Sequence, residues 1–236
     1  MLLRLCAAVG LSVPAGAPPR AAPRCVGAGP TAEESLLRLL TAETPPDEAR
    51  IDALCAELEA SAPPDAAPAL DPRIEGDWLL LHTSKSEFDP RSPLGARADG
   101  STPGLEALFA RVTGGSGGKP SASPLQRALT RAFPVKQTIT LRREPRALSF
   151  RCDTPIGELI LRAAATTSPN EPRRIGLLFD EGYLAARNGV RVPYPVPFRA
   201  LGDEARGWLD TSFLGETLRI STGNKGTRFV LQRQGQ

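Results

Sequence analysis

Residues 208–231 of this 236-residue chain read WLDTSFLGETLRISTGNKGTRFVL, and this ending decides the fold. Apolar and polar side chains alternate over residues 218–221 (LRIS), which is the period of a strand with one apolar face. The next residues, 223–226 (GNKG), favour a turn, and residues 227–231 resume an extended, β-prone run. The ending therefore predicts a β-hairpin with one face to bury.

The same alternation recurs from residue 74 onward and predicts nine short strands. We expect them at residues 74–84, 135–141, 147–152, 157–163, 174–179, 183–187, 192–199, 217–221 and 227–232. Short polar turns join most of them, which favours an antiparallel meander that closes as a barrel or packs as a sandwich. The long interval after the first strand has apolar residues at helical spacing over 103–112 and predicts one helical insertion.

Two amphipathic helices are predicted before the first strand. Thr31 and Glu34 form a capping-box pattern ahead of leucines at helical spacing. In the second helix apolar residues recur at i, i+3, i+4 and i+7 from Ile51; Thr44 is its expected cap, and it ends near Ser61 before a proline-rich stretch. The predicted organisation is a leader at 1–30, a helical segment and linker at 31–72, and a β domain at 73–236.

The leader is rich in Ala, Pro, Gly and Arg and contains no acidic residue, which is the composition of an organelle transit peptide. Its apolar stretch 2–13 also fits a secretory signal, or a two-part leader in which an export signal precedes a transit peptide. The residues do not separate these three alternatives. No later stretch reaches the ~18 uninterrupted apolar residues of a membrane span, so we expect any membrane contact to be peripheral.

The net charge of +3 belongs to the leader rather than to the body of the chain. Three of the 29 basic residues lie in residues 1–30, which leaves 26 basic against 26 acidic residues. A neutral body lacks the electrostatic footprint of a phosphate binder. The sequence therefore predicts no nucleic-acid partner.

One catalytic motif occurs, at residues 114–118 (GGSGG), and matches the G-x-S-x-G of serine hydrolases. That motif requires a preceding strand and a later histidine. Here a helix is predicted before Ser116, and His82, the only histidine, lies upstream. A Gly/Ser linker produces the same string by composition. We therefore expect no catalytic residue and no enzymatic activity.

No metal site or cofactor is predicted either. The acids that remain lie at expected turns, where solvated side chains are the rule. Cys6 and Cys25 fall in the leader, which leaves Cys55 and Cys152, and the chain has no C-x-x-C. These two are expected to be buried small hydrophobes, with a disulfide between them left open.

The first predicted strand contains the G-x-W that opens lipocalin barrels, at residues 76–78. Both faces of residues 78–82 (WLLLH) are mainly apolar, so we expect both faces of the strand to be shielded from solvent. One face would line the barrel lumen and the other would pack under a helix. In lipocalin barrels an Arg from a late strand stacks on that Trp, and Arg219 is the corresponding residue here. The predicted lining of the lumen is Trp78, Leu80, His82, Arg219 and Phe229.

Three segments resemble the plastid lipid-associated proteins, also called fibrillins. Residues 218–231 are similar to the family ending L-R-I-S-R-G-N/D-K-G-x-x-F-V-L, residues 74–84 to L-x-G-x-W-x-L-L-Y-T-S, and residues 135–139 to V-Y-Q-T-I. The resemblance covers about residues 31–234. It departs at His82, where the family usually has Tyr, and at Thr222, where Arg is usual.

The resemblance implies a lipocalin-like antiparallel β-barrel in plastids, at plastoglobules or thylakoids. It also implies binding of a prenylquinone, carotenoid or fatty acid, with no established enzymatic activity. Three hypotheses follow. The chain is a plastid lipid carrier with an apolar cavity, a structural coat protein of plastid lipid droplets without an internal ligand, or a barrel enzyme acting on such lipids.

Overall fold

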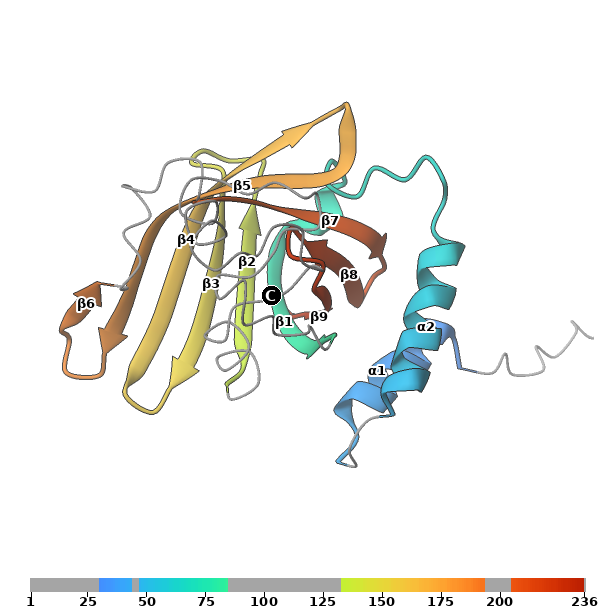
Figure 1. The fold of residues 1–236 in the computed structure, drawn as a ribbon, viewed down its shortest axis with the longest axis horizontal. Helices are drawn as coiled ribbons and strands as arrows, with labels where there is room; N and C mark the ends of the chain where they lie inside the picture. The colour runs from blue at the N-terminus through green and yellow to red at the C-terminus, as the bar shows by residue number, and fades with distance from the viewer. Residues whose placement is uncertain (1–29, 44–46, 85–132, 194–204, 236) are drawn as a thin grey trace, which may run out of the picture.

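The computed structural model describes residues 30–43, 47–84, 133–193 and 205–235 (Figure 1). Two helices, α1 (Ala32–Thr41) and α2 (Glu48–Ser61), and a 3-10 turn (Pro72–Ile74) precede the strands. The strands are β1 (Gly76–Thr83), β2 (Val135–Thr140), β3 (Ala147–Thr154), β4 (Gly157–Ser168), β5 (Glu171–Ala186), β6 (Arg191–Pro193), β7 (Arg206–Leu214), β8 (Leu218–Gly223) and β9 (Arg228–Arg233).

Eight of these strands form a closed ring of antiparallel pairings. Their order is β4-β3-β2-β1-β9-β8-β7-β5, and β5 pairs with β4 again. The ninth strand, β6, pairs with the second half of β5, beyond the residues that pair with β7. The predicted class, mainly antiparallel β with N-terminal helices, is confirmed. The predicted helical insertion at 103–112 lies outside the described residues.

The structure corrects the predicted elements at three places. The strands expected at 174–179 and 183–187 are one strand, β5, with a register shift between its two halves. Strand β7 was not predicted at all. Helix α2 is capped by Asp47, whose Oδ1 accepts from the N–H groups of Ala49 and Arg50, and not by Thr44.

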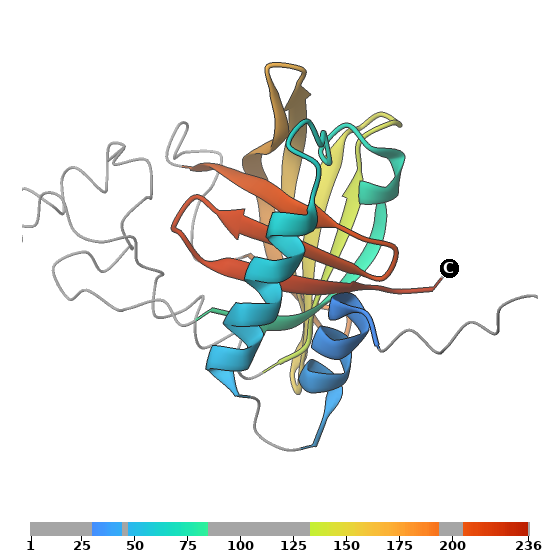
Figure 2. The same cartoon turned by 90° about the vertical axis from the view of Figure 1, so that its right-hand side faces the viewer.

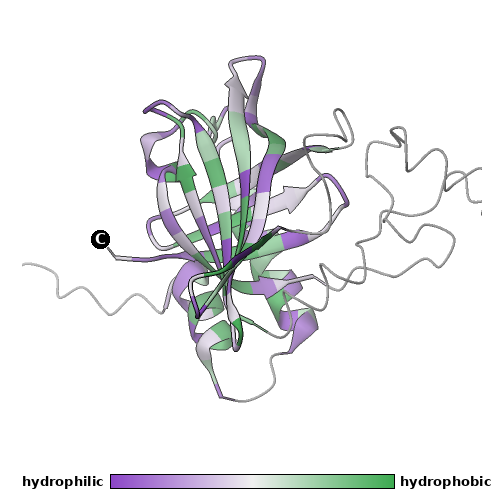
Figure 3. Cartoon of the chain, turned by 90° about the vertical axis from the view of Figure 1, so that its left-hand side faces the viewer, coloured by the Kyte–Doolittle hydropathy of each residue, from purple (hydrophilic) through white to green (hydrophobic). Residues whose placement is uncertain are grey.

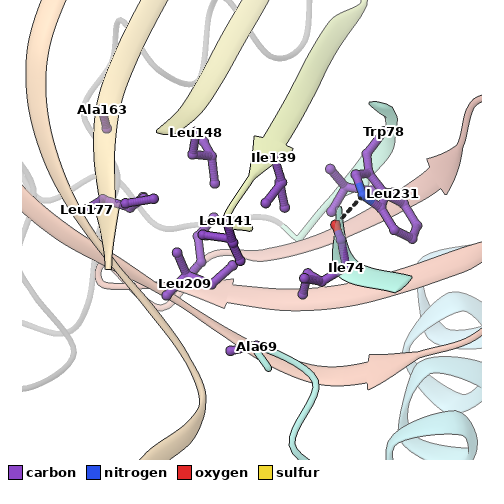
Figure 4. Close-up of a cluster of buried hydrophobic side chains, with 12 residues drawn as sticks. Ala69, Ile74, Trp78, Ile139, Leu141, Leu148, Ala163, Leu177, Leu209 and Leu231 are labelled. Atoms are coloured by element: carbon purple, nitrogen blue, oxygen red, sulfur yellow. Dashed lines mark hydrogen bonds between the residues drawn. The ribbon is translucent and has the colours of Figure 1, made fainter. Parts of the chain in front are cut away.

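The strands alternate hydrophobic and hydrophilic residues (Figure 3). One apolar cluster lies inside the ring and a second lies on its outer surface, under the helices. The inner cluster fills one end of the ring around Trp78, Ile139 and Leu231 (Figure 4). The outer cluster packs the helices against strands β8 and β9, through Leu218, Ile220 and Val230 on the strands; its helical members are Leu36, Ile51, Leu54, Cys55 and Leu58. Figure 2 shows α2 lying across these strands.

Polar contacts at the margins hold the helices on the ring. Glu33 Oε1 of α1 accepts from Thr217 N (2.9 Å), Thr217 Oγ1 (2.6 Å) and Leu218 N (2.8 Å) in the β7–β8 turn. In α2, Asp52 pairs with Arg228 at 3.0 Å. These contacts orient the helices so that their apolar faces cover β8 and β9.

Candidate ligand site inside the strand ring

Trp78 lies on the inner side of the ring and has no exposed surface. Its indole Nε1–H donates to the carbonyl oxygen of Ile74 at 2.9 Å, which satisfies its polar atom (Figure 4). Ile74 belongs to the 3-10 turn that enters β1, so the turn and the indole close this end of the ring together.

Two guanidinium groups lie over the Trp78 ring. Arg219 of β8 is 4.8 Å and Arg233 of β9 is 4.3 Å from the ring centroid. The predicted contact between Trp78 and Arg219 is thus confirmed, at a distance suited to a cation–π interaction. Arg233 was not predicted, because the last strand was expected to end at residue 232. The register shows why Arg233 is there: it pairs directly with Trp78 across β1 and β9.

The two arginines differ in how their donors are used. Arg233 donates to the backbone carbonyls of Glu216 (3.2 Å), Glu75 (3.1 Å) and Arg73. Arg219 donates from Nη2 to Gln137 Oε1, and its Nε and Nη1 have no hydrogen-bond partner. Since Arg219 is completely buried, two charged donors are left unsatisfied inside the ring.

Burial, and to a smaller extent the charge of Arg233, lowers the pKa of Arg219 to about 9. The group is therefore still a cation at neutral pH. No acidic side chain among the described residues forms an ion pair with Arg219, and the contacts described for its guanidinium are with the neutral Gln137 and the face of Trp78.

The inner wall beside Arg219 is polar. Ser221 is two residues further along the same face of β8, and its hydroxyl is 3.0 Å from that of Thr211 on β7. Both residues are completely buried, and Gln137 is 4% exposed. One part of the interior is therefore polar and buried. Alternation in the sequence did not reveal this, because polar residues in a strand are usually expected on its exposed face.

Several apolar side chains packed against the inner cluster are only partly buried. Leu80 and Phe229 are in contact with the inner cluster, where the sequence placed them. Phe150 and Phe179 join them, with their rings stacked at a centroid distance of 6.0 Å. Neither phenylalanine was predicted as a site residue, although both lie in predicted strands and Phe150 has polar neighbours on both sides.

His82 was predicted to share the inner face with Trp78 and Leu80, and the structure corrects this. β1 shifts register between Leu80 and His82, so His82 pairs with Val230 of the outer cluster. A bulge places two residues opposite one and reverses the alternation after it. His82 Nε2 lies 3.6 Å from Glu48 Oε2 of α2, on the helix side of the ring.

The described residues offer no candidate metal centre. They contain no group of three or more His, Cys, Asp or Glu side chains that could hold a metal ion. Cys55 and Cys152 are buried and not bonded to each other, and burial raises the pKa of the Cys55 thiol to about 11, which keeps it protonated and unreactive. Ser116 lies outside the described residues.

None of the helices in the described part of the chain is long and apolar enough to cross a membrane.

A family model described as PAP_fibrillin matches residues 119–232. Residues 119–232 thus match a fibrillin domain. The match includes Gln137 and Arg219, and it leaves Trp78 and the two helices outside. The chain is also 44% identical over 122 residues to the probable plastid-lipid-associated protein 12, chloroplastic, of Arabidopsis thaliana. That alignment covers 48% of this chain and 29% of the relative. No solved structure matches the fibrillin domain or the rest of the chain.

Proposed function

We propose that the chain holds a hydrophobic small molecule inside its strand ring and catalyses no reaction. The observation that carries this proposal is the change in burial along the inner wall. Side chains around Trp78 are fully buried, whereas the inward-facing Leu80, Phe150, Phe179 and Phe229 are only partly buried. Apolar side chains that point inward and still reach solvent line an interior that is incompletely filled.

The proposed architecture is a lipocalin-like barrel closed at the Trp78 end. The G-x-W at residues 76–78, the Arg219 stacked on Trp78 and the closed ring of pairings support it. The ligands it suits are prenylquinones, carotenoids or fatty acids. The site residues that remain in the proposal are Trp78, Leu80, Arg219 and Phe229, with Phe150 and Phe179 added and His82 removed.

The proposed location is the plastid, at plastoglobules or thylakoids. The acid-free, Arg-bearing leader and the chloroplastic relative support import into that organelle. A fluorescent protein fused behind residues 1–40 is expected to enter plastids. Cytosolic fluorescence of that fusion would contradict both the location and the proposed boundary of the leader near residue 30.

Lipids that copurify with the protein from its own organelle test the proposed ligand. Mass spectrometry should detect a prenylquinone, carotenoid or fatty acid in near-stoichiometric amount. Phe179→Ser, on the inner wall, should reduce that lipid at least tenfold. Leu178→Ser is the matched control, because Leu178 is the adjacent residue on the same strand and is 41% exposed. Equal lipid in the two variants would contradict an internal site.

A second candidate function is a coat on lipid droplets, and one surface favours it. Three apolar side chains are strongly exposed at neighbouring hairpin tips: Ile156 (67%), Val190 (53%) and Val192 (48%). The β3–β4 and β5–β6 tips lie together, since the N–H of Arg187 donates to the carbonyl oxygen of Ile156 at 3.3 Å. Exposed apolar side chains beside the cationic side chain of Arg187 suit contact with an anionic lipid surface.

Flotation with vesicles of anionic plastid lipids tests the coat function. The double variant Ile156→Asp, Val192→Asp should float at least fivefold less than the parent chain. Leu70→Asp is the control, because Leu70 is 42% exposed and lies outside these hairpins. If all three proteins float alike, the hairpin tips do not contact lipid.

A further inference from the structure

Buried Arg219 is the least satisfied group in the described structure. It crosses the interior from β8 to reach Gln137 on β2, although β9 and β1 lie between these two strands in the ring. Its Nε and Nη1 have no hydrogen-bond partner, and no carboxylate among the described residues forms an ion pair with it. Leaving a buried charge in this state is costly, so such a group is usually paired or serves binding.

Two features of the surroundings point to an anionic ligand group. First, Gln137, Thr211 and Ser221 make the inner wall around Arg219 polar, which an occupant made only of hydrocarbon does not need. Second, Arg233, the other cation on Trp78, already donates to three backbone carbonyls, so the unsatisfied donors belong to Arg219. A single cation with two unpartnered donor nitrogens suits one monoanion.

We propose that the ring binds a long-chain carboxylic acid, with its carboxylate at Arg219 and its tail along Leu80, Phe150, Phe179 and Phe229. This inference rests on the proposed lipid-binding function and selects one ligand class within it. The carboxylate accepts from an unsatisfied N–H group of Arg219, and the tail covers the partly exposed apolar wall. A carotene has no acceptor for the unsatisfied donors, and a quinone carbonyl accepts a hydrogen bond but carries no charge to compensate the guanidinium.

The charged head group predicts a preference that a merely apolar interior lacks. Binding of hexadecanoic acid, its methyl ester and hexadecane to the full chain is measured at pH 8 by displacement of one fluorescent apolar dye. The acid should bind at least tenfold more tightly than the ester. This ratio should collapse as the pH falls below the carboxyl pKa of ~4–5, whereas binding of the ester should not change.

Variants assign the preference to Arg219. Arg219→Met should reduce the acid-to-ester ratio to within twofold, and Arg219→Lys should restore part of it. Arg151→Met is the matched control, since Arg151 is on β3 with a side chain that is 54% exposed, and it should keep the full ratio. If Arg219→Met does not fold, the pH dependence of the acid-to-ester ratio in the parent chain still tests whether the ring prefers a carboxylate.

Different outcomes separate this inference from the function on which it rests. Equal affinity for acid and ester in the parent chain, or an unchanged ratio in Arg219→Met, overturns the carboxylate site and leaves lipid binding in place. Failure of the acid, the ester and hexadecane to displace the dye, together with the absence of copurifying lipid, overturns both.

Discussion

The two faces of strand β8 are both buried, and they are built in opposite ways. Leu218 and Ile220 face the helices in an apolar cluster whose polar contacts lie at the margins. Arg219 and Ser221 face the interior, where Arg219 has two donors without partners. The helix face is therefore optimised for stability. The inner face retains polar groups that cost stability, and such groups are expected where a ligand binds.

The largest effect should follow from Trp78→Ala on the inner side. Removal of a fully buried indole should lower the free energy of unfolding by about 3–5 kcal/mol, because the cavity cannot collapse between the two arginines. Urea denaturation measures this loss. Trp208→Ala, on the half-buried second tryptophan, is the control and should cost less. Equal losses would contradict a closing role for Trp78.

On the helix face, Leu54→Ala should lower the free energy of unfolding by about 2–4 kcal/mol and leave ligand selectivity unchanged. Leu54 is 3% exposed within the outer cluster and contributes nothing to the inner wall. Thermal denaturation and the lipid-displacement assay together check both parts. A change in the acid-to-ester ratio would show that the two faces are coupled.

The contact between Trp78 and Arg219 should appear as a coupling energy. In a double-mutant cycle of Trp78→Phe and Arg219→Met, we expect about 1 kcal/mol of non-additivity, from a cation–π contact at 4.8 Å. The single change Arg219→Met can still be neutral overall, because it also removes a buried charge. Additive losses in chemical denaturation would mean that the two side chains are neighbours without an energetic interaction.

Glu33→Gln tests the attachment of α1. The carboxylate accepts three hydrogen bonds from Thr217 and Leu218, and the neutral amide accepts them more weakly, so a loss of about 1 kcal/mol is expected. Glu34→Gln is the matched control, since Glu34 takes part only in the helix's own capping box. Equilibrium unfolding that shows no difference between the two variants would remove Glu33 as an anchor.

Ser116→Ala should have the smallest effect. It should change stability and lipid binding by less than ~0.5 kcal/mol, as expected for a residue in a Gly/Ser linker without a catalytic role. Denaturation and lipid displacement measure this, and an ester-hydrolysis assay provides the independent check. Loss of a hydrolase activity in this variant would establish the G-x-S-x-G segment as a nucleophile elbow.

The fold was predictable where alternation is regular, and it was missed at bulges. β8 and β9 appear where the hairpin was expected, because two short alternating runs flank a turn. β5 reads as two strands because residues 180–182 (DEG) are typical of a turn, yet the strand continues through a register shift there. β7 was missed because its register shift lies between Thr211 and Phe213 and interrupts the period of two.

The same physical reason explains the errors at the site. Trp78, Leu80, Arg219 and Phe229 follow strict alternation and were placed on the inner side. His82 follows the β1 bulge, and a single extra residue moves every later side chain to the other face. The unsatisfied donors of Arg219 depend on which side chains meet across the ring, and no local pattern in one strand contains that information.

The pairing of β1 with β9 has a consequence for how the chain folds. These strands are separated by most of the sequence, and their contact is the one that joins the first part of the ring to its last strand. Until Arg228–Arg233 is in place, β1 and β8 each have an open edge, with backbone donors and acceptors free to pair with another chain. Closure is thus a non-local step of high contact order, and we expect it to be late. A chain truncated before β9 is expected to aggregate rather than to fold into a smaller ring.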